Sequence, residues 1–483
     1  MPAHSPPSRP RRLPAATAVL LAAALAGCAT PGVGAPGTTP AVLPVPDAWS
    51  LTPEGTAPQP SADLADWWTR FNDPQLSAWV AQALQANTGV RSAQAALQQA
   101  RAQRDVTLGG QAPAVGVSGS AQRSQVADNA PGNTFRAGLD ASWEPDVFGA
   151  QRSARAASDA DVQAAAASLG HARVSLAAEV ALTTLELRGL QTRLALAQDN
   201  LAKQREALQL TEWRVQAGLA SSLELAQGRS AVEQTRAALP ALDTAIRQSW
   251  NALAVLTGQP PGTLQRADPA PAPLPQPPEG LGLSFPADTL RQRPDVRVTE
   301  QRVLAAWARV QQADANRYPS LRLSGSLGLN APRLADLFDL TALTRSVLAG
   351  VTASLLDGGA ARAQVRVQQA ALAQARLAHE AAVLTALQDV ENALAALQGN
   401  RERLARLTQA AEAATTAEAL ARQRYASGLV DYGTVLDTQR ALLSLQSELA
   451  TARTTWSADH VRLYKALGGG WTPDAPTTDR STP

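Results

Sequence analysis

The sequence predicts an α+β membrane protein in which very long α-helices join a small β-sheet, and this unit occurs twice in one chain. Three observations predict the class. Short motifs recur at a nearly constant interval, and four short stretches alternate apolar with small polar residues. In addition, proline-free runs are long enough for helices of about 100 Å at ~1.5 Å per residue. A helical body of coiled-coil type with a sheet completed by several chains would satisfy all three.

The recurring motifs establish the internal repeat. Ser118 in VSGS and Ser324 in LSGS are separated by 324 − 118 = 206 residues. Four further pairs keep the same order along the chain: Val90 and Val296, Asp146 and Asp357, Gly218 and Gly428, Gly258 and Gly469. Their offsets run from 206 to 211 residues, so the insertions fall in turns. A collinear series of this kind predicts a duplicated fold.

Each half is predicted to contain the same elements around a proline-rich linker at 259–285, which cannot be helical. The first repeat, 63–258, has a helical stretch at Pro74–Leu108, strands at about 113–122 and 134–143, and a helical hairpin at 150–258 whose first helix is about Ala150–Gln216. The second repeat, 286–470, has a helical stretch at Pro286–Asn316, strands at about 319–329 and 345–356, and a hairpin at 358–468 whose first helix is about Ala360–Ala426. A tail at 471–483 follows.

The N-terminus has the pattern of a bacterial export signal. Residues 1–27 contain a basic start and a short apolar run, and they end at LAGC, which resembles a lipobox. Cys28 in this motif is the only cysteine of the chain. We predict that Cys28 carries a diacylglycerol and an N-acyl lipid, and that 28–62 form a lipidated tether. Ala29, in place of aspartate, predicts export to the outer membrane. The alternative is an ordinary signal with an incidental cysteine.

Three aromatic residues, Trp67, Trp68 and Phe71, precede the first helix. We interpret them as a hydrophobic anchor that packs the tether against the helical body, rather than as an aromatic binding site.

The four strand-like stretches predict a sheet with one face toward lipid. In the third stretch Leu321, Leu323 and Leu327 fall on one side, and Ser324 and Ser326 fall on the other. Four strands cannot close a barrel alone, and an open sheet edge is not tolerated in lipid. The pattern therefore favours a barrel shared between several chains, although a soluble half-buried sheet remains an alternative.

Composition argues against several classes of function. Lys and Arg number 43 against 41 Asp and Glu, which gives no basic footprint for nucleic acid. The histidines stand singly, and neither a phosphate-binding glycine loop nor a nucleophile elbow occurs. We expect no enzyme activity, no metal, no cofactor and no nucleic-acid partner.

Six motifs together resemble the TolC-type outer-membrane factors, in the NodT/OprM-like lipoprotein branch. They begin at Trp67, Trp143, Leu290, Tyr318, Leu355 and Arg424 and read WWTRFNDPQLSAWVAQALQANTGVR, WEPDVFG, LRQRPDVRVTEQRVLAAWARV, YPSLRLSGSLG, LLDGGAARA and RYASGLVDYGTVLDTQRALL. They cover nearly the whole mature chain in the family's order.

The resemblance implies a homotrimer in the outer membrane of a Gram-negative bacterium. It implies a twelve-stranded β-barrel, four strands per chain, that continues as a coiled-coil α-helical barrel through the periplasm. The implied function is a passive duct of a tripartite efflux system, which exports drugs or other small solutes. The implied partners are a periplasmic adaptor protein, an inner-membrane RND-type pump and outer-membrane lipid.

The same resemblance marks candidate gate residues at the periplasmic tip, where Gly218 and Gly428 form the turns of the two hairpins. Asp437 matches the family's acidic tip position, and threefold symmetry would turn it into a ring of charge. Thr434 stands where TolC carries a second acid. Tyr425 and Glu224 match positions that form a hydrogen-bonded link holding the TolC tip closed. The alternatives are an ordinary exposed carboxylate for Asp437 and a core aromatic for Tyr425.

Two other functions remain open. A type I secretion duct uses the same fold. A structural periplasmic coiled-coil lipoprotein would explain the helices and Cys28, but it leaves the four amphipathic strands unexplained.

Overall fold

The computed structural model describes residues 46–51, 64–125, 130–264, 272–277 and 286–472. The predicted signal, Cys28 and most of the predicted tether lie outside the described residues.

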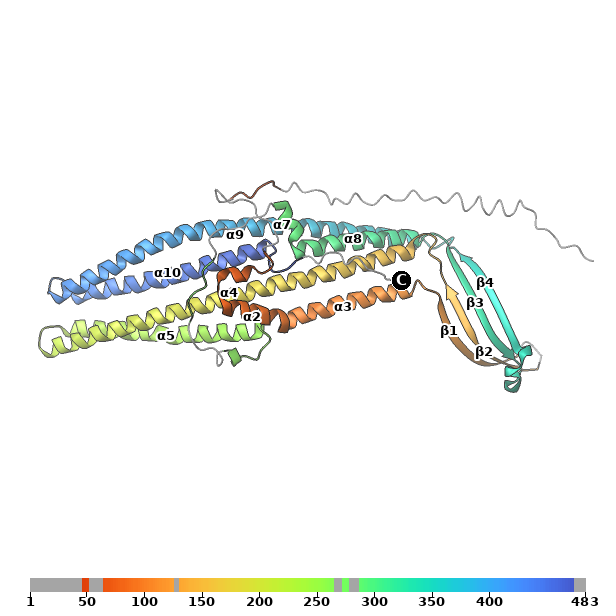
Figure 1. Ribbon diagram of the computed structural model, residues 1–483, viewed down its shortest axis with the longest axis horizontal. Coiled ribbons are helices and arrows are strands. Elements are labelled where there is room, and N and C mark those ends of the chain that lie inside the picture. The colour runs from red at the N-terminus through yellow and green to blue at the C-terminus, as the bar shows by residue number, and fades with distance from the viewer. Residues whose placement is uncertain (1–45, 52–63, 126–129, 265–271, 278–285, 473–483) are drawn as a thin grey trace, which may run out of the picture. The chain divides into compact units, whose positions relative to one another are not determined.

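The two halves of the chain contain the same order of elements (Figure 1). The first half comprises η2 (Trp67–Phe71), α2 (Pro74–Ala86), α3 (Thr88–Gly109), β1 (Ala114–Ser124), β2 (Gly132–Trp143), α4 (Ala150–Gln216) and α5 (Ser222–Leu256). The second half comprises α7 (Pro286–Gln292), α8 (Pro294–Ala315), β3 (Ser320–Ala331), η3 (Leu334–Phe338), η4 (Leu340–Ala342), β4 (Leu343–Thr352), α9 (Ala360–Ala426) and α10 (Tyr432–Ala466).

The long helices α4 and α9 have the bounds that the sequence predicts, and each contains 67 residues. Alanine, leucine, glutamine and arginine dominate both helices, and these residues have high helix propensity. Helix α4 packs along α3, α5, α8 and α10, and α9 packs along α8 and α10. Among the described residues, no helix is both long enough and apolar enough to cross a membrane.

Each predicted leading helix is two helices in the structure. In the first half the break is at Asn87, whose side chain accepts hydrogen bonds from the backbone of Gly89 and Val90 and so caps α3. In the second half the break is at Arg293, because Pro294 disfavours the helical conformation of the residue before it.

The fourth strand ends earlier than the sequence predicts. The sequence predicts this strand at about 345–356, but β4 ends at Thr352. The chain then turns into α9 through Gly358 and Gly359, which both have positive φ angles, at 64° and 86°. The Asp357 carboxylate accepts hydrogen bonds from the backbone of Gly359 and Ala361 and holds this turn. Residues 353–356 therefore belong to the turn into the helix.

The four strands form one antiparallel sheet in the order β1-β2-β3-β4, so the β2–β3 pair joins the two repeats. Val117 lies opposite Leu139, Leu139 opposite Leu327, and Leu323 opposite Ala349. The register therefore places all odd-numbered strand residues on one side, which we call the apolar face. The even-numbered residues form the polar face.

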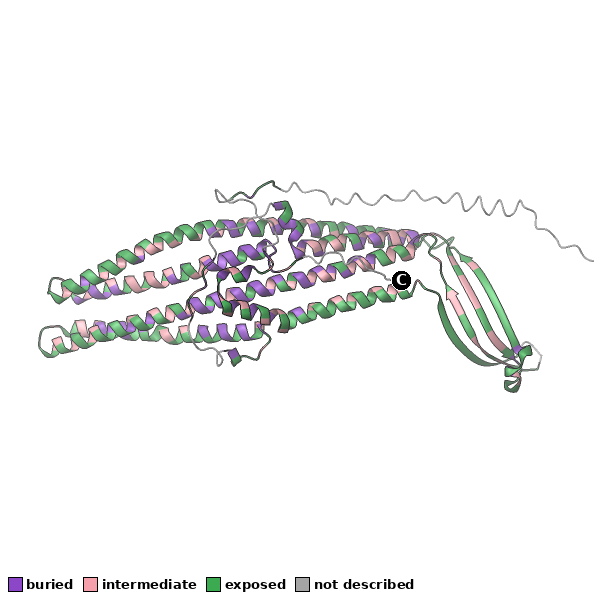
Figure 2. Ribbon diagram, viewed as in Figure 1, coloured by how far each residue is buried: buried purple, intermediate pink, exposed green. Residues whose placement is uncertain are grey.

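The largest core lies in the middle of the helical body (Figure 2). Trp67 is fully buried, and its ring stacks on Tyr464 of α10 at a centroid distance of 5.4 Å. Trp68 and Phe71 are also buried there. These contacts agree with the interpretation of the three aromatics as a packing anchor.

Candidate functional site

The two hairpin turns are built alike. Gly218 and Gly428 have φ angles of 72° and 75°, a conformation that glycine adopts without strain. Leu219 N–H donates to the Arg214 carbonyl at 2.7 Å, and Leu429 N–H donates to the Arg424 carbonyl at 2.9 Å, as in a Schellman motif. Since α4 and α9 begin just after β2 and β4, both turns lie one long helix, about 100 Å, from the sheet.

The structure brings Tyr425 and Glu224 together. The Tyr425 hydroxyl on α9 donates to Glu224 Oε2 on α5 at 3.4 Å, which is a long hydrogen bond. The Arg214 guanidinium on α4 lies 4.7 Å from the centroid of the same ring. Burial raises the pKa of the Tyr425 hydroxyl; Arg214 opposes that shift, and the Glu224 carboxylate adds to it. The contact links the two hairpins within one chain.

Tyr432, which the sequence did not single out, is the buried centre of this contact. It is 2% exposed at the start of α10 and packs with Ala231 of α5 and with Tyr425. Gly228 of α5 permits the approach, because a Cβ atom there would lie 3.1 Å from the Tyr432 hydroxyl. The sequence does contain a signal for this contact, because two of the chain's four tyrosines, Tyr425 and Tyr432, lie on either side of the Gly428 turn.

The acidic groups of α10 differ from the expected pattern. The Asp437 side chain is 78% exposed and lies 3.6 Å from Arg440, one turn further along the helix. Thr434 donates from its backbone and from its hydroxyl to Asp431 Oδ1, at 2.9 and 2.6 Å. These bonds lower the pKa of the Asp431 carboxyl. The second exposed acid of this tip is therefore Asp431, the N-cap of α10, which the sequence analysis did not name.

The sheet separates its two kinds of side chain as the sequence predicts. Leu321, Leu323 and Leu327 lie on the apolar face, where Val117 and Val347 are 85% and 92% exposed. On the polar face the Ser118 hydroxyl donates to Asp140 Oδ2 at 2.5 Å, and the hydroxyls of Ser326 and Ser346 lie 2.7 Å apart. Two cations also lie on the apolar face, Arg123 opposite Asn133 and Arg345 opposite Leu327. These two positions break the simple alternation.

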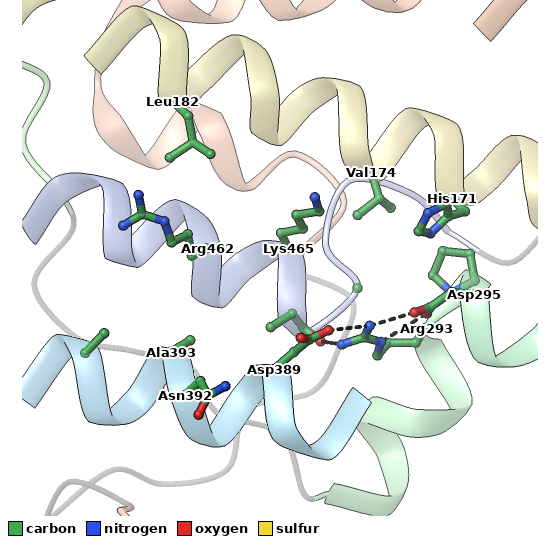
Figure 3. A pocket seen from close by; sticks show the side chains of 14 residues that line it. His171, Val174, Leu182, Arg293, Asp295, Asp389, Asn392, Ala393, Arg462 and Lys465 are labelled. Atoms are coloured by element: carbon green, nitrogen blue, oxygen red, sulfur yellow. Dashed lines mark hydrogen bonds and ion pairs between the residues drawn. The ribbon is translucent and has the colours of Figure 1, made fainter. Parts of the chain in front are cut away.

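A polar junction joins α8 to the end of α10 beside a cavity of about 430 Å³ (Figure 3). The Arg293 guanidinium pairs with Asp295 at 2.6 Å and with Asp389 at 2.9 Å. It also donates to the carbonyl of Ala466, the last residue of α10, at 3.0 Å. Burial lowers the pKa of the adjacent His171 imidazole, although Asp295 opposes this shift.

The first repeat has an equivalent but simpler junction. Asn87, at the N-cap of α3, donates to the carbonyl of Leu256, the last residue of α5, at 2.9 Å. Gly258 packs tightly here, since a Cβ atom would lie 2.7 Å from the Ala86 carbonyl oxygen. Both junctions hold helix ends together, and the described residues contain no group of three or more His, Cys, Asp or Glu that could hold a metal ion.

The chain also matches known proteins. The sequence model of the outer membrane efflux protein family matches residues 79–259 and 285–469, one segment in each repeat. The chain belongs to this family. The pyoverdine export outer membrane protein OpmQ of Pseudomonas putida is 32% identical over 469 residues, which is 95% of this chain and 97% of OpmQ. Nodulation protein T of Rhizobium leguminosarum is 29% identical over 93% of this chain and 96% of its own length. The solved structure of the outer-membrane channel OprN covers 90% of this chain and 100% of its own, with 33% identity and a TM-score of 0.84.

Membership confirms the resemblance that the motifs predict, and with it the fold class of long helices plus a β-domain. The protein is an outer-membrane efflux channel component, and its location is the outer membrane. Its relatives are channel proteins. The assignments of Asp437, Thr434, Tyr425, Glu224 and Cys28 remain predictions.

Proposed function

We propose that three copies of this efflux protein form a passive duct, whose barrel contains 3 × 4 = 12 strands. One observation carries the proposal: β1 and β4 are the edges of a sheet whose apolar face is exposed. Unpaired backbone groups cannot remain in lipid, and pairing of β4 with β1 of the next copy would remove every edge. The helices below would then continue the barrel as a tunnel. No catalytic step and no cofactor is part of the proposal.

The partners we propose are a periplasmic adaptor and an inner-membrane RND-type pump that supplies the solute. The solute class we propose is small organic molecules. Support comes from the names of relatives, which include pyoverdine export for OpmQ and toluene efflux for TtgF of Pseudomonas putida, a protein 30% identical to this chain. Small hydroxyl side chains on the polar face suit a water-filled passage without a preference for one solute.

We further propose that lipid on Cys28 supplies a second anchor, and the docking of a segment within the predicted tether supports this. Trp49 is buried, and Ser50 donates from its backbone to Glu391 Oε1 on α9 at 2.9 Å. Glu391 lies 391 − 360 = 31 residues below the start of α9, or about 46 Å. The 49 − 28 = 21 residues up to Trp49 can span about 70 Å when extended, so the chain is long enough to reach a membrane at the level of the sheet. Mass spectrometry of the mature N-terminus tests the lipid.

At the tip, we propose that the Tyr425–Glu224 bond acts as a latch and that Asp437 forms a charge ring when three copies assemble. The support is the contact between the hairpins and the exposure of Asp437.

The barrel is tested by arginine substitutions on the two faces of one strand. Leu323→Arg lies on the apolar face and should lower the free energy of unfolding of the barrel by roughly 2–4 kcal/mol near the bilayer midplane. Its matched control, Ser324→Arg, is the next residue on the polar face and should be tolerated. The measurements are folded yield in the outer membrane and mass in detergent, which should be three times that of one chain. Equal sensitivity of both positions, or a monomer in detergent, would contradict the proposal.

A further inference from the structure

The loop between β3 and β4 folds onto one face of the sheet. Its residues 332–342, which we call the flap, contain η3 and η4. Leu337 and Ala342 of the flap are 6% and 7% exposed, and they cluster with Ala331 against Phe135 and Leu329. These three strand residues are odd-numbered and belong to the apolar face. Since β3 begins after α8 and β4 leads into α9, the flap covers the apolar face at the end remote from the helices.

The outer surface of the flap is strongly apolar. Leu334, Phe338 and Leu340 are 61%, 84% and 91% exposed, within seven consecutive residues. Such a cluster is unfavourable in water and marks an interaction surface. Leu337 already attaches the flap to the sheet, so the three exposed side chains are free to contact another surface.

We propose that the flap is an interfacial membrane anchor, with Leu334, Phe338 and Leu340 among the acyl chains of the outer leaflet. The inference rests on the proposed function, because it requires the apolar face to meet lipid. The position of the flap favours this inference, because the flap packs on the same apolar face of the sheet that carries Val347. Asp339, exposed between two of the apolar residues, keeps the flap at the boundary with water rather than in the membrane interior.

The spacing of aromatic residues supports a position of the flap at the border between the membrane and water. On the apolar face of β2, Trp143 lies at the helix end and Phe135 at the flap end. The 143 − 135 = 8 residues between them span about 26 Å along the strand at ~3.3 Å per residue, or about 20 Å along the membrane normal at a tilt of ~40°, which is most of the ~25 Å apolar band of outer-membrane barrels. Aromatic girdles mark both borders of such a band, and the flap that carries Phe338 packs on Phe135 through Leu337. Arg345, on the apolar face near the same end, supplies a cation for a headgroup phosphate.

The test uses the full-length protein in phosphatidylcholine vesicles with one spin label at a time. Phe338→Cys carries the label on the flap, Val347→Cys on the apolar face of β4, and Leu348→Cys on the polar face. The unsubstituted chain, taken through the same labelling, gives the background from Cys28. Collision with oxygen, which concentrates in lipid, is compared with collision with an aqueous nickel chelate. We expect the ratio of oxygen to nickel collision at Phe338→Cys to exceed that at Leu348→Cys several-fold and to approach that at Val347→Cys.

The outcomes separate the flap from the barrel. A water-exposed label at Phe338→Cys beside a lipid-exposed label at Val347→Cys would overturn the anchor and leave the duct intact. A label at Phe338→Cys protected from both reagents would mean that a neighbouring copy covers the flap, which also overturns the anchor. A water-exposed label at Val347→Cys would instead refute the proposed barrel. As a second variant, adding Leu337→Ser should detach the flap and lower the ratio at Phe338→Cys several-fold without changing it at Val347→Cys.

Discussion

The latch at the tip gives the sharpest prediction about conduction. Tyr425→Phe with Glu224→Gln removes the hydrogen bond between the hairpins but keeps an aromatic ring under Arg214. A hydrogen bond to a charged group contributes about 1.5–3 kcal/mol, and a donor–acceptor distance of 3.4 Å with partial exposure reduces this to about 1 kcal/mol. Three latches acting together contribute about 3 kcal/mol, which corresponds to a shift of roughly 100-fold toward the open state.

Single-channel recording in planar bilayers measures this shift as a rise in open probability. Ser427→Ala is the matched control, because its hydroxyl bonds only within the same helix, to the Gln423 carbonyl at 3.2 Å. The control should conduct like the parent. A double variant that also conducts like the parent would show that the bond does not hold the tip, and the constriction would then have to depend on the buried Tyr432 contact.

Three further predictions concern the tip and the central junction. Asp437→Ala should lower the cation-over-anion permeability ratio without raising open probability; an unchanged reversal potential in a salt gradient would exclude the charge ring. Gly228→Leu should force the hairpins apart, lower the free energy of unfolding by about 1–3 kcal/mol and raise conductance. The control is Gly399→Leu, at a helical glycine with open space beside it, and it should change neither quantity. Because burial lowers the pKa of His171 in the folded chain, the unfolded chain binds that proton more tightly, so the free energy of unfolding should fall as pH drops below about 6.5. His171→Gln should remove part of this fall in thermal melts between pH 7.5 and 5.5. The remaining fall should come from His460, whose pKa is also lowered by burial. An unaltered pH profile would refute the assignment to His171.

The bounds of the long helices could be predicted because both signals are local. An alanine-rich run without proline continues through each helix, and a glycine, Gly218 or Gly428, stands two residues after its end at the start of a second helical pattern. The break at Arg293 also has a local signal, since Pro294 follows it. The break at Asn87 follows less directly, because asparagine is tolerated within a helix and its side chain here also donates to the end of α5.

Other features depend on contacts that no local pattern encodes. The predicted fourth strand was too long because Leu355 and Leu356 extend an apolar pattern that belongs to a turn. Proline normally interrupts a helix, yet α5 continues through Pro240. Tyr432 was missed because its importance arises from the absence of a side chain at Gly228, on another helix. The faces of the sheet were predictable because alternation alone fixes them.

The duplication that built this chain left two joints of unequal stiffness. One joint is a single neutral bond from Asn87 to the end of α5, and the other is the Arg293 guanidinium with two carboxylates and the end of α10. Charge-assisted networks resist displacement more than one amide bond does. A ring of three chains would then contain six joints, and compliant joints would alternate with stiff joints around the circumference. When such a ring widens, the three hairpins of α4 and α5 would bend, while the three hairpins of α9 and α10 would stay in place.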